Sequence, residues 1–264
     1  MSLEERSAFS IELCRAAGAL ARDHFARRDQ LRVDQKGSQD WVSEADRKVE
    51  SFIRESIAEA WPQDGVVGEE HDDTPGSNDF TWVIDPIDGT TNFLSGIPTW
   101  AVVLAGVSEG ETRIGVVHDP IYGETFSALR GGGARLNGRA IRVAEGKTLD
   151  DGIVAVGYSN RVRAENVAST VAALVVRGTM FHRNASGALS LAYVAAGRLV
   201  GYVEEHMNAW DCLAGLLLVT EAGGLTEDLN ADEMIREGGR VIAGAPQVFE
   251  ELKSMSTPAW GGSG

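Results

Sequence analysis

A short apolar run that ends in Asp-Pro-Ile-Asp-Gly constrains this chain more than any other stretch. Residues 81–84 are β-branched or aromatic, which predicts a strand that delivers its C-terminal end to Asp85. Pro86 fixes its own φ and favours an extended conformation at Asp85. Asp85 and Asp88 are therefore expected to project from one rigid turn at the end of the strand.

The same turn combines acids with backbone amide donors. Asp88 fits an N-cap, and the residues after it would begin a helix whose free amides, those of Gly89 and Thr90, favour an anion such as phosphate. Two carboxylates repel phosphate, but divalent cations between the acids and the ligand remove this conflict. Mg²⁺ prefers oxygen ligands, and the Ile87 carbonyl could be one more. A simple turn without a ligand stays an alternative, since each of these residue types favours turns.

The longer stretch Trp-Val-Ile-Asp-Pro-Ile-Asp-Gly-Thr-Thr-Asn-Phe, residues 82–93, closely resembles the signature of the inositol monophosphatase family. Members are Mg²⁺-dependent, lithium-sensitive phosphatases of sugars and polyols. The resemblance implies an α/β (α+β) fold, a layered α-β-α-β-α sandwich of the sugar-phosphatase type. It also implies two or three Mg²⁺ ions per active site, and family members are commonly homodimers.

The resemblance also implies a set of metal ligands. A first Mg²⁺ would be held by Glu69, Asp85 and the Ile87 carbonyl, and a second by Asp85, Asp88 and Asp211. Glu69 belongs to a Gly-Glu-Glu element, although adjacent glutamates are usually only exposed. Asp211 precedes an apolar helix, so an N-cap is its alternative role.

Catalytic roles follow from a second matched segment, Asp-Trp-Val-Ser-Glu-Ala-Asp, which ends at Asp46 and has Ser43 where the family has threonine. By resemblance, Asp46 helps activate the attacking water through the Thr90 hydroxyl, and Glu69 orients that water. From the residues alone, Ser43 fits a helix N-cap with Asp46 as its capping partner. The two roles of Asp46 do not exclude each other.

Substrate contacts are implied at Asp88, Gly187 and Glu204. Glu204 aligns with a family residue that binds a substrate hydroxyl, and a strand-end surface charge is its alternative. Ala-Ser-Gly-Ala around Gly187 departs from the family's Gly-Ser/Thr-Ala-Ala, which could reshape the pocket near the sugar ring. Arg183, just before this loop, could contact a leaving group or a surface carboxylate.

The predicted reaction is Mg²⁺-dependent hydrolysis of a phosphate monoester, inositol 1-phosphate, to alcohol and inorganic phosphate by metal-activated water. Histidinol phosphate, fructose 1,6-bisphosphate and a 3′-phosphoadenosine nucleotide are alternative substrates for the same site. A basic pocket for a second phosphate would favour the last two, and the sequence shows no obvious basic cluster. The alternative from another class is a partner-binding protein in RNA or transcription machinery, a role credited to some bacterial relatives.

Composition excludes several other classes of protein. The net charge of −15 argues against nucleic-acid binding through phosphate neutralisation. No apolar run approaches the ~20 residues of a membrane span, and the first residues lack the apolar core of a signal peptide. Cys14 and Cys212 lie far apart and give no disulfide framework, so the cytoplasm is the expected compartment.

The chain is expected to form one compact catalytic unit with two halves that meet near residues 149–152. Residues 1–150 would hold an antiparallel sheet and most metal ligands, and residues 151–264 an α/β half. The C-terminal tail from Pro258, apart from Trp260, is expected to be disordered. Apolar spacing predicts helices at 7–28, from 43 onward, and at 164–176, 188–196 and 212–221.

Overall fold

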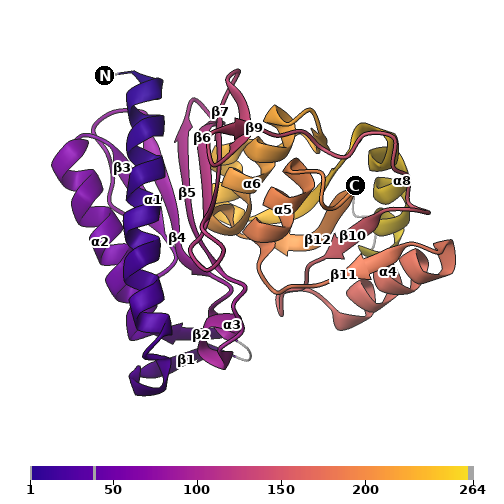
Figure 1. The fold of residues 1–264 in the computed structure, drawn as a ribbon, viewed down its shortest axis with the longest axis horizontal. Coiled ribbons are helices and arrows are strands. Elements are labelled where there is room, and N and C mark those ends of the chain that lie inside the picture. Colours follow the sequence, from indigo (N-terminus) through magenta and orange to yellow (C-terminus); the bar gives the residue numbers. More distant parts are fainter. Residues whose placement is uncertain (1, 38–39, 261–264) are drawn as a thin grey trace.

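The computed structural model, which describes residues 2–37 and 40–260, is layered in the order helix, sheet, helix, sheet, helix (Figure 1). This arrangement confirms the layered α-β-α-β-α fold predicted above. Two sheets of unequal size face each other across a central pair of helices. None of the described helices is long and apolar enough to cross a membrane.

The first sheet has seven strands in the order β3-β4-β5-β6-β7-β8-β9. β3 runs parallel to β4, and every other neighbouring pair is antiparallel, as the sequence predicts for this part of the chain. The strands are β3 (Gly65–Gly68), β4 (Thr81–Asp88), β5 (Ala101–Ser108), β6 (Glu111–Asp119), β7 (Glu124–Leu129), β8 (Gly133–Leu136) and β9 (Arg139–Ala140). β4 is buried from Trp82 to Asp88 because helices cover both faces of the sheet.

Helices α1 (Leu3–Phe25) and α2 (Glu44–Ala60) cover the outer face of this sheet. α2 packs Val49, Ile53 and Ile57 against it, as its amphipathic pattern predicts. The remaining elements on this side are η1 (Arg28–Gln30), the hairpin β1 (Val33–Gly37) and β2 (Asp40–Ser43), and the short helix α3 (Thr90–Ser95).

The second sheet has five strands in the order β11-β10-β12-β14-β13. β10 lies parallel to β11 and to β12, whereas β14 is antiparallel to both β12 and β13. The strands are β10 (Ile153–Val156), β11 (Met180–His182), β12 (Gly201–Met207), β13 (Leu225–Thr226) and β14 (Gly239–Gly244). Its outer face carries α4 (Ala164–Arg177) and α8 (Pro246–Ser256), and α7 (Ala231–Glu237) and η2 (Thr257–Trp260) complete the chain.

The central layer consists of α5 (Gly187–Ala195) and α6 (Ala209–Glu221). α6 approaches β6 so closely that a Cβ built on Gly115 would lie 2.6 Å from the Ala214 carbonyl oxygen. Glycine at this position permits that approach. One apolar core joins side chains of both sheets, for example Val103 and Val203, through these helices.

Several sequence predictions need correction. α3 begins after Gly89 and α6 after Asn208, so neither Asp88 nor Asp211 is the N-cap of the helix that follows it. The tail is helical through Trp260, while its last residues lie outside the described part of the chain. The two sheets draw on residues before 141 and after 152, but the division into halves as domains stays a prediction.

Candidate metal and phosphate site

The end of β4 forms the turn that the sequence predicts. The pairing of β4 with β5 skips a residue between Asp85 and Asp88, so Pro86 occupies a bulge where no ladder donor is needed. The Ile87 amide donates a hydrogen bond of 2.9 Å to Asp85 Oδ1. This contact fixes the orientation of a carboxylate that is only 1% exposed.

Three carboxylates form a cluster in which Asp85 and Asp88 are buried and Asp211 is half-buried. One oxygen from each lies within 4.8 Å of the other two. Burial, followed by the charges of Glu69, Asp88 and Asp211, raises the pKa of Asp85 well above its usual range. Burial and the Asp211 charge raise the pKa of Asp88 to about 7, and burial also raises that of Asp211. Crowded buried carboxylates of this kind suit a hard divalent cation that offsets their repulsion.

Asp88 also holds the first sheet to the central layer. Its Oδ2 accepts hydrogen bonds from the Ser186 hydroxyl and, at 2.9 Å, from the Ala188 amide at the start of α5. Asp88 therefore helps to cap α5, a helix that begins about a hundred residues later. Ser186 was missed as a site residue, although a serine directly before an apolar helix is a recognisable N-cap signal.

Asp211 is the third residue of α6 and takes part in a capping box with Asn208. The Asn208 amide donates to Asp211 Oδ2 at 3.3 Å, while Asn208 is the N-cap. This geometry directs the Asp211 carboxylate toward the helix start, where it meets the end of β4. α6 thus places the Asp211 carboxylate close to those of Asp85 and Asp88.

Asp46 and Thr90 meet as expected from the matched segments. Thr90 Oγ1 lies 3.1 Å from Asp46 Oδ1 and 3.1 Å from the Ile87 carbonyl oxygen. Asp46 Oδ2 accepts from the Ser43 amide at 2.9 Å and from the Ser43 hydroxyl, which confirms the predicted capping box of α2. Asp46 is fully buried, and burial raises its pKa.

The start of α3 also lines the site. Gly89 has φ = +100°, and a Cβ there would lie 3.1 Å from the Thr99 carbonyl oxygen. Only glycine fits this turn without strain. Gly89 and Thr90 line the same cavity as the acids.

This cavity of 390 Å³ opens between the two halves of the chain. Glu69, at the end of β3, lines it and is half-buried. Loop residues that follow β10 and β11 also line the cavity. Tyr158, Ser159, Asn160 and Arg161 follow β10 and were not predicted from the sequence. Arg183 and Ala185 follow β11 and belong to the segment for which the sequence analysis considered substrate contacts.

Glu204 lies beside this cavity rather than in it. It lines a neighbouring hollow of 90 Å³ that shares Tyr158, Arg183 and Ala185 with the larger one. Its carboxylate is buried, accepts a hydrogen bond from the Tyr202 hydroxyl, and has its pKa raised by burial to about 8. The alternative of an exposed surface charge is therefore wrong. Gly187 lines neither hollow, and its backbone lies next to Asp88.

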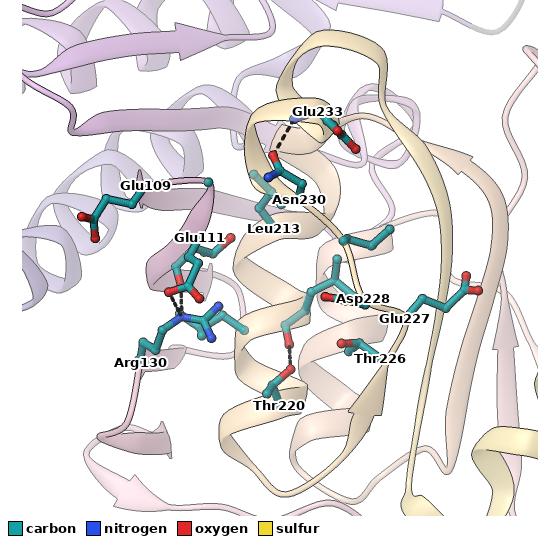
Figure 2. A pocket seen from close by; sticks show the side chains of 15 residues that line it. Glu109, Glu111, Arg130, Leu213, Thr220, Thr226, Glu227, Asp228, Asn230 and Glu233 are labelled. Atoms are coloured by element: carbon teal, nitrogen blue, oxygen red, sulfur yellow. Dashed lines mark hydrogen bonds and ion pairs between the residues drawn. The ribbon is translucent and has the colours of Figure 1, made fainter.

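A second cavity, of 490 Å³, lies on another side of α6 (Figure 2). It is also acidic, but several of its carboxylates are neutralised. Glu109 and Glu111 contact Arg113 at 2.7 and 2.6 Å, and Glu227 contacts Arg240 at 2.6 Å. In the described part of the chain, the only group of three potential metal ligands is the one around Asp85. The first cavity is therefore the candidate active site.

Comparison with known proteins shows the family of this chain. The model of the inositol monophosphatase family matches residues 2–257, and the chain belongs to this family. It is 38% identical over 246 residues to Nus factor SuhB of Escherichia coli (strain K12), covering 92% of each chain. It is 40% identical over 244 residues to inositol-1-monophosphatase of Rhizobium meliloti (strain 1021), covering 91% of each.

Solved structures agree in fold along the whole chain. The suhB protein of Bartonella henselae has a TM-score of 0.89 at 34% identity, covering 94% of this chain and 97% of that one. The IMPase of Thermotoga maritima has a TM-score of 0.86 at 33% identity, with 97% and 98% covered.

Proposed function

We propose that this protein hydrolyses phosphate monoesters with Mg²⁺ and that inositol 1-phosphate is a substrate. The observation that carries the proposal is the cluster of Asp85, Asp88 and Asp211 beside the Thr90–Asp46 pair. The donor set is made of carboxylate oxygens, which is the chemistry that Mg²⁺ prefers. A relative at 40% identity bears the name inositol-1-monophosphatase, which supports the choice of ester.

The three aspartates would hold the cation, together with Glu69 and the Ile87 carbonyl. Bound Mg²⁺ would supply Lewis-acid stabilisation of the phosphoryl group and a lowered pKa of water. Thr90 donates its hydroxyl proton to Asp46, so that its oxygen can accept a proton from an attacking water. The amides at the start of α3 would donate to phosphate oxygens.

The test is phosphate release from a panel of inositol 1-phosphate, histidinol phosphate, fructose 1,6-bisphosphate and 3′-phosphoadenosine 5′-phosphate, with Mg²⁺ or with chelator. Turnover that chelator abolishes supports the proposal, and the preferred ester identifies the substrate class. We expect Asp88→Asn to lower turnover by about 100-fold or more without loss of fold. Near-normal turnover of this variant would show that the assignment is wrong.

A second candidate function is partner binding in transcription, because several relatives at 37–38% identity bear the name Nus factor. This role does not need turnover. Capture of RNA polymerase or its elongation factors by both the wild type and Asp88→Asn would support it. If neither protein captures them while the wild type retains turnover, only the enzymatic function is supported.

We also propose a cytoplasmic homodimer. Both cysteines are buried and free, which fits a reducing compartment. The outer strand β11 exposes Met180 and Phe181, apolar side chains that a second copy could cover. Light scattering after gel filtration, together with cell fractionation, tests both statements.

A further inference from the structure

The cavity of the candidate active site contains basic as well as acidic residues. Glu69, Asp85, Asp88 and Asp211 line it. Arg161, in the loop after β10, and Arg183, directly after β11, line it as well. With cations bound to the acids, these guanidinium groups would give the rest of the cavity a positive charge.

Both arginines are available to a ligand. Their residues are exposed, and within the described residues neither side chain has a recorded ion pair or hydrogen bond. The neighbouring Arg163 differs, because it contacts Glu165 at 3.5 Å and does not line the cavity. In a chain with 39 acidic and 24 basic residues, an unpaired arginine pair in one cavity is an unexpected arrangement.

The two arginines share the cavity with the candidate cation ligands. Arg161 and Asp211 both line it, and Arg183 also lines the neighbouring hollow that holds Glu204. A ligand bound at the start of α3 would therefore share the cavity with both guanidinium groups.

We propose that Arg161 and Arg183 form an anion subsite that recognises a second phosphate or a carboxylate on the alcohol portion of the substrate. This inference rests on the proposed phosphatase function and narrows its substrate class. The planar guanidinium forms paired, charge-assisted hydrogen bonds with either anion. Inositol 1-phosphate offers only hydroxyl groups at that end, so a substrate with a second anion makes contacts that it lacks.

The experiment compares esters that differ only in the second anion. One pair is fructose 1,6-bisphosphate and fructose 1-phosphate, and the other is 2-phosphoglycerate and glycerol 2-phosphate. Values of kcat and KM are measured with saturating Mg²⁺ for the wild type, Arg161→Gln, Arg183→Gln, the double variant and the control Arg163→Gln. The first pair tests a second phosphate as the anion, and the second pair tests a carboxylate.

We expect the wild type to prefer the member with the second anion in at least one pair. The double variant should lower that preference, expressed as the ratio of the two kcat/KM values, by about tenfold, mainly through KM. Arg163→Gln should leave the ratio unchanged. An equal loss for both members of a pair, or the same change in the control, would overturn the subsite.

A failure of the proposed function is recognisable separately, since no ester would then be hydrolysed with Mg²⁺. In that case, calorimetric binding of fructose 1,6-bisphosphate with Mg²⁺ to the wild type and the double variant still tests the subsite. Binding that is about tenfold weaker in the double variant supports it, and equal binding or none refutes it.

Discussion

Each aspartate of the candidate metal site is a residue whose burial opposes folding and would favour cation binding. The pKa values of Asp85, Asp88 and Asp211 are all raised, which means that their charged forms are held at a cost in the metal-free protein. A bound cation would relieve this cost and so stabilise the fold. Sites built for function often carry such a penalty.

Replacement of Asp211 by asparagine should separate stability from function. We expect the Tm in chelator to rise by roughly 2 °C or more, because one buried charge is removed while an acceptor for the Asn208 amide is kept. The stabilisation of the wild type by added Mg²⁺ should be mostly lost. Thermal unfolding with and without Mg²⁺ checks both effects, and an unchanged Mg²⁺ response would mean that Asp211 is not a ligand.

Glu204 predicts a pH dependence of stability. Burial raises its folded pKa to about 8 from an ordinary value of 4.5, so the folded state binds the proton more tightly than the unfolded chain. Its contribution is therefore fully present below about pH 4.5 and is lost as the pH rises to about 8. Between pH 5 and 8, the Tm of metal-free Glu204→Gln should fall less than that of the wild type. Parallel Tm curves would contradict the assigned burial.

At the scale of elements, the start of α2 serves folding and chemistry through the same contacts. Ser43 caps the helix and donates to Asp46, whose other oxygen meets Thr90 on α3. A change in the cap therefore reaches the hydroxyl that lines the cavity. The family threonine at this position offers the same hydroxyl.

Ser43→Ala should lose both the cap of α2 and the hydrogen bond that the Ser43 hydroxyl donates to Asp46. We expect a loss of about 1 kcal/mol in the free energy of unfolding, seen as a Tm lower by about 2–4 °C. Turnover should also fall, because Asp46 loses a donor that orients it. Ser43→Thr is the matched control and should keep both properties. Normal turnover in a destabilised Ser43→Ala variant would mean that the helix cap does not affect catalysis.

At the scale of the whole molecule, the central layer joins the two sheets. α5 and α6 share one apolar core with strands from both sides, and α6 contacts β5, β6 and β14. A core of this kind is expected to unfold as a unit. The candidate active site lies where the two sheets' elements meet, so its geometry depends on this layer.

We therefore predict one calorimetric unfolding transition for the metal-free protein. Gly115→Ala places a Cβ against the α6 backbone and should cost about 1–3 kcal/mol, which lowers the whole transition by several degrees. Two separate transitions, or a shift confined to one of two, would mean that the halves unfold independently. Circular dichroism and intrinsic fluorescence should report the same midpoint.

Local sequence signals were enough to predict several elements up to residue 221 and most candidate acids. The β4 strand and its turn, the cap at Ser43, and the α6 helix depend on neighbours within a few residues, so propensity and spacing were enough to predict them. The resemblance supplied the roles of Glu69 and Asp211, which spacing alone left open. The C-terminal elements β13, β14, α7 and α8 were not predicted.

Only the tertiary structure decided which distant residues meet. It brought Asp211 within 4.8 Å of Asp85 and Asp88, turned Asp88 toward the start of α5, and buried Glu204. It also brought Arg161 and Arg183 into the lining of one cavity, although the sequence showed no basic cluster. The reason is physical: caps and propensities act over a turn or two, whereas these contacts depend on how the layers pack.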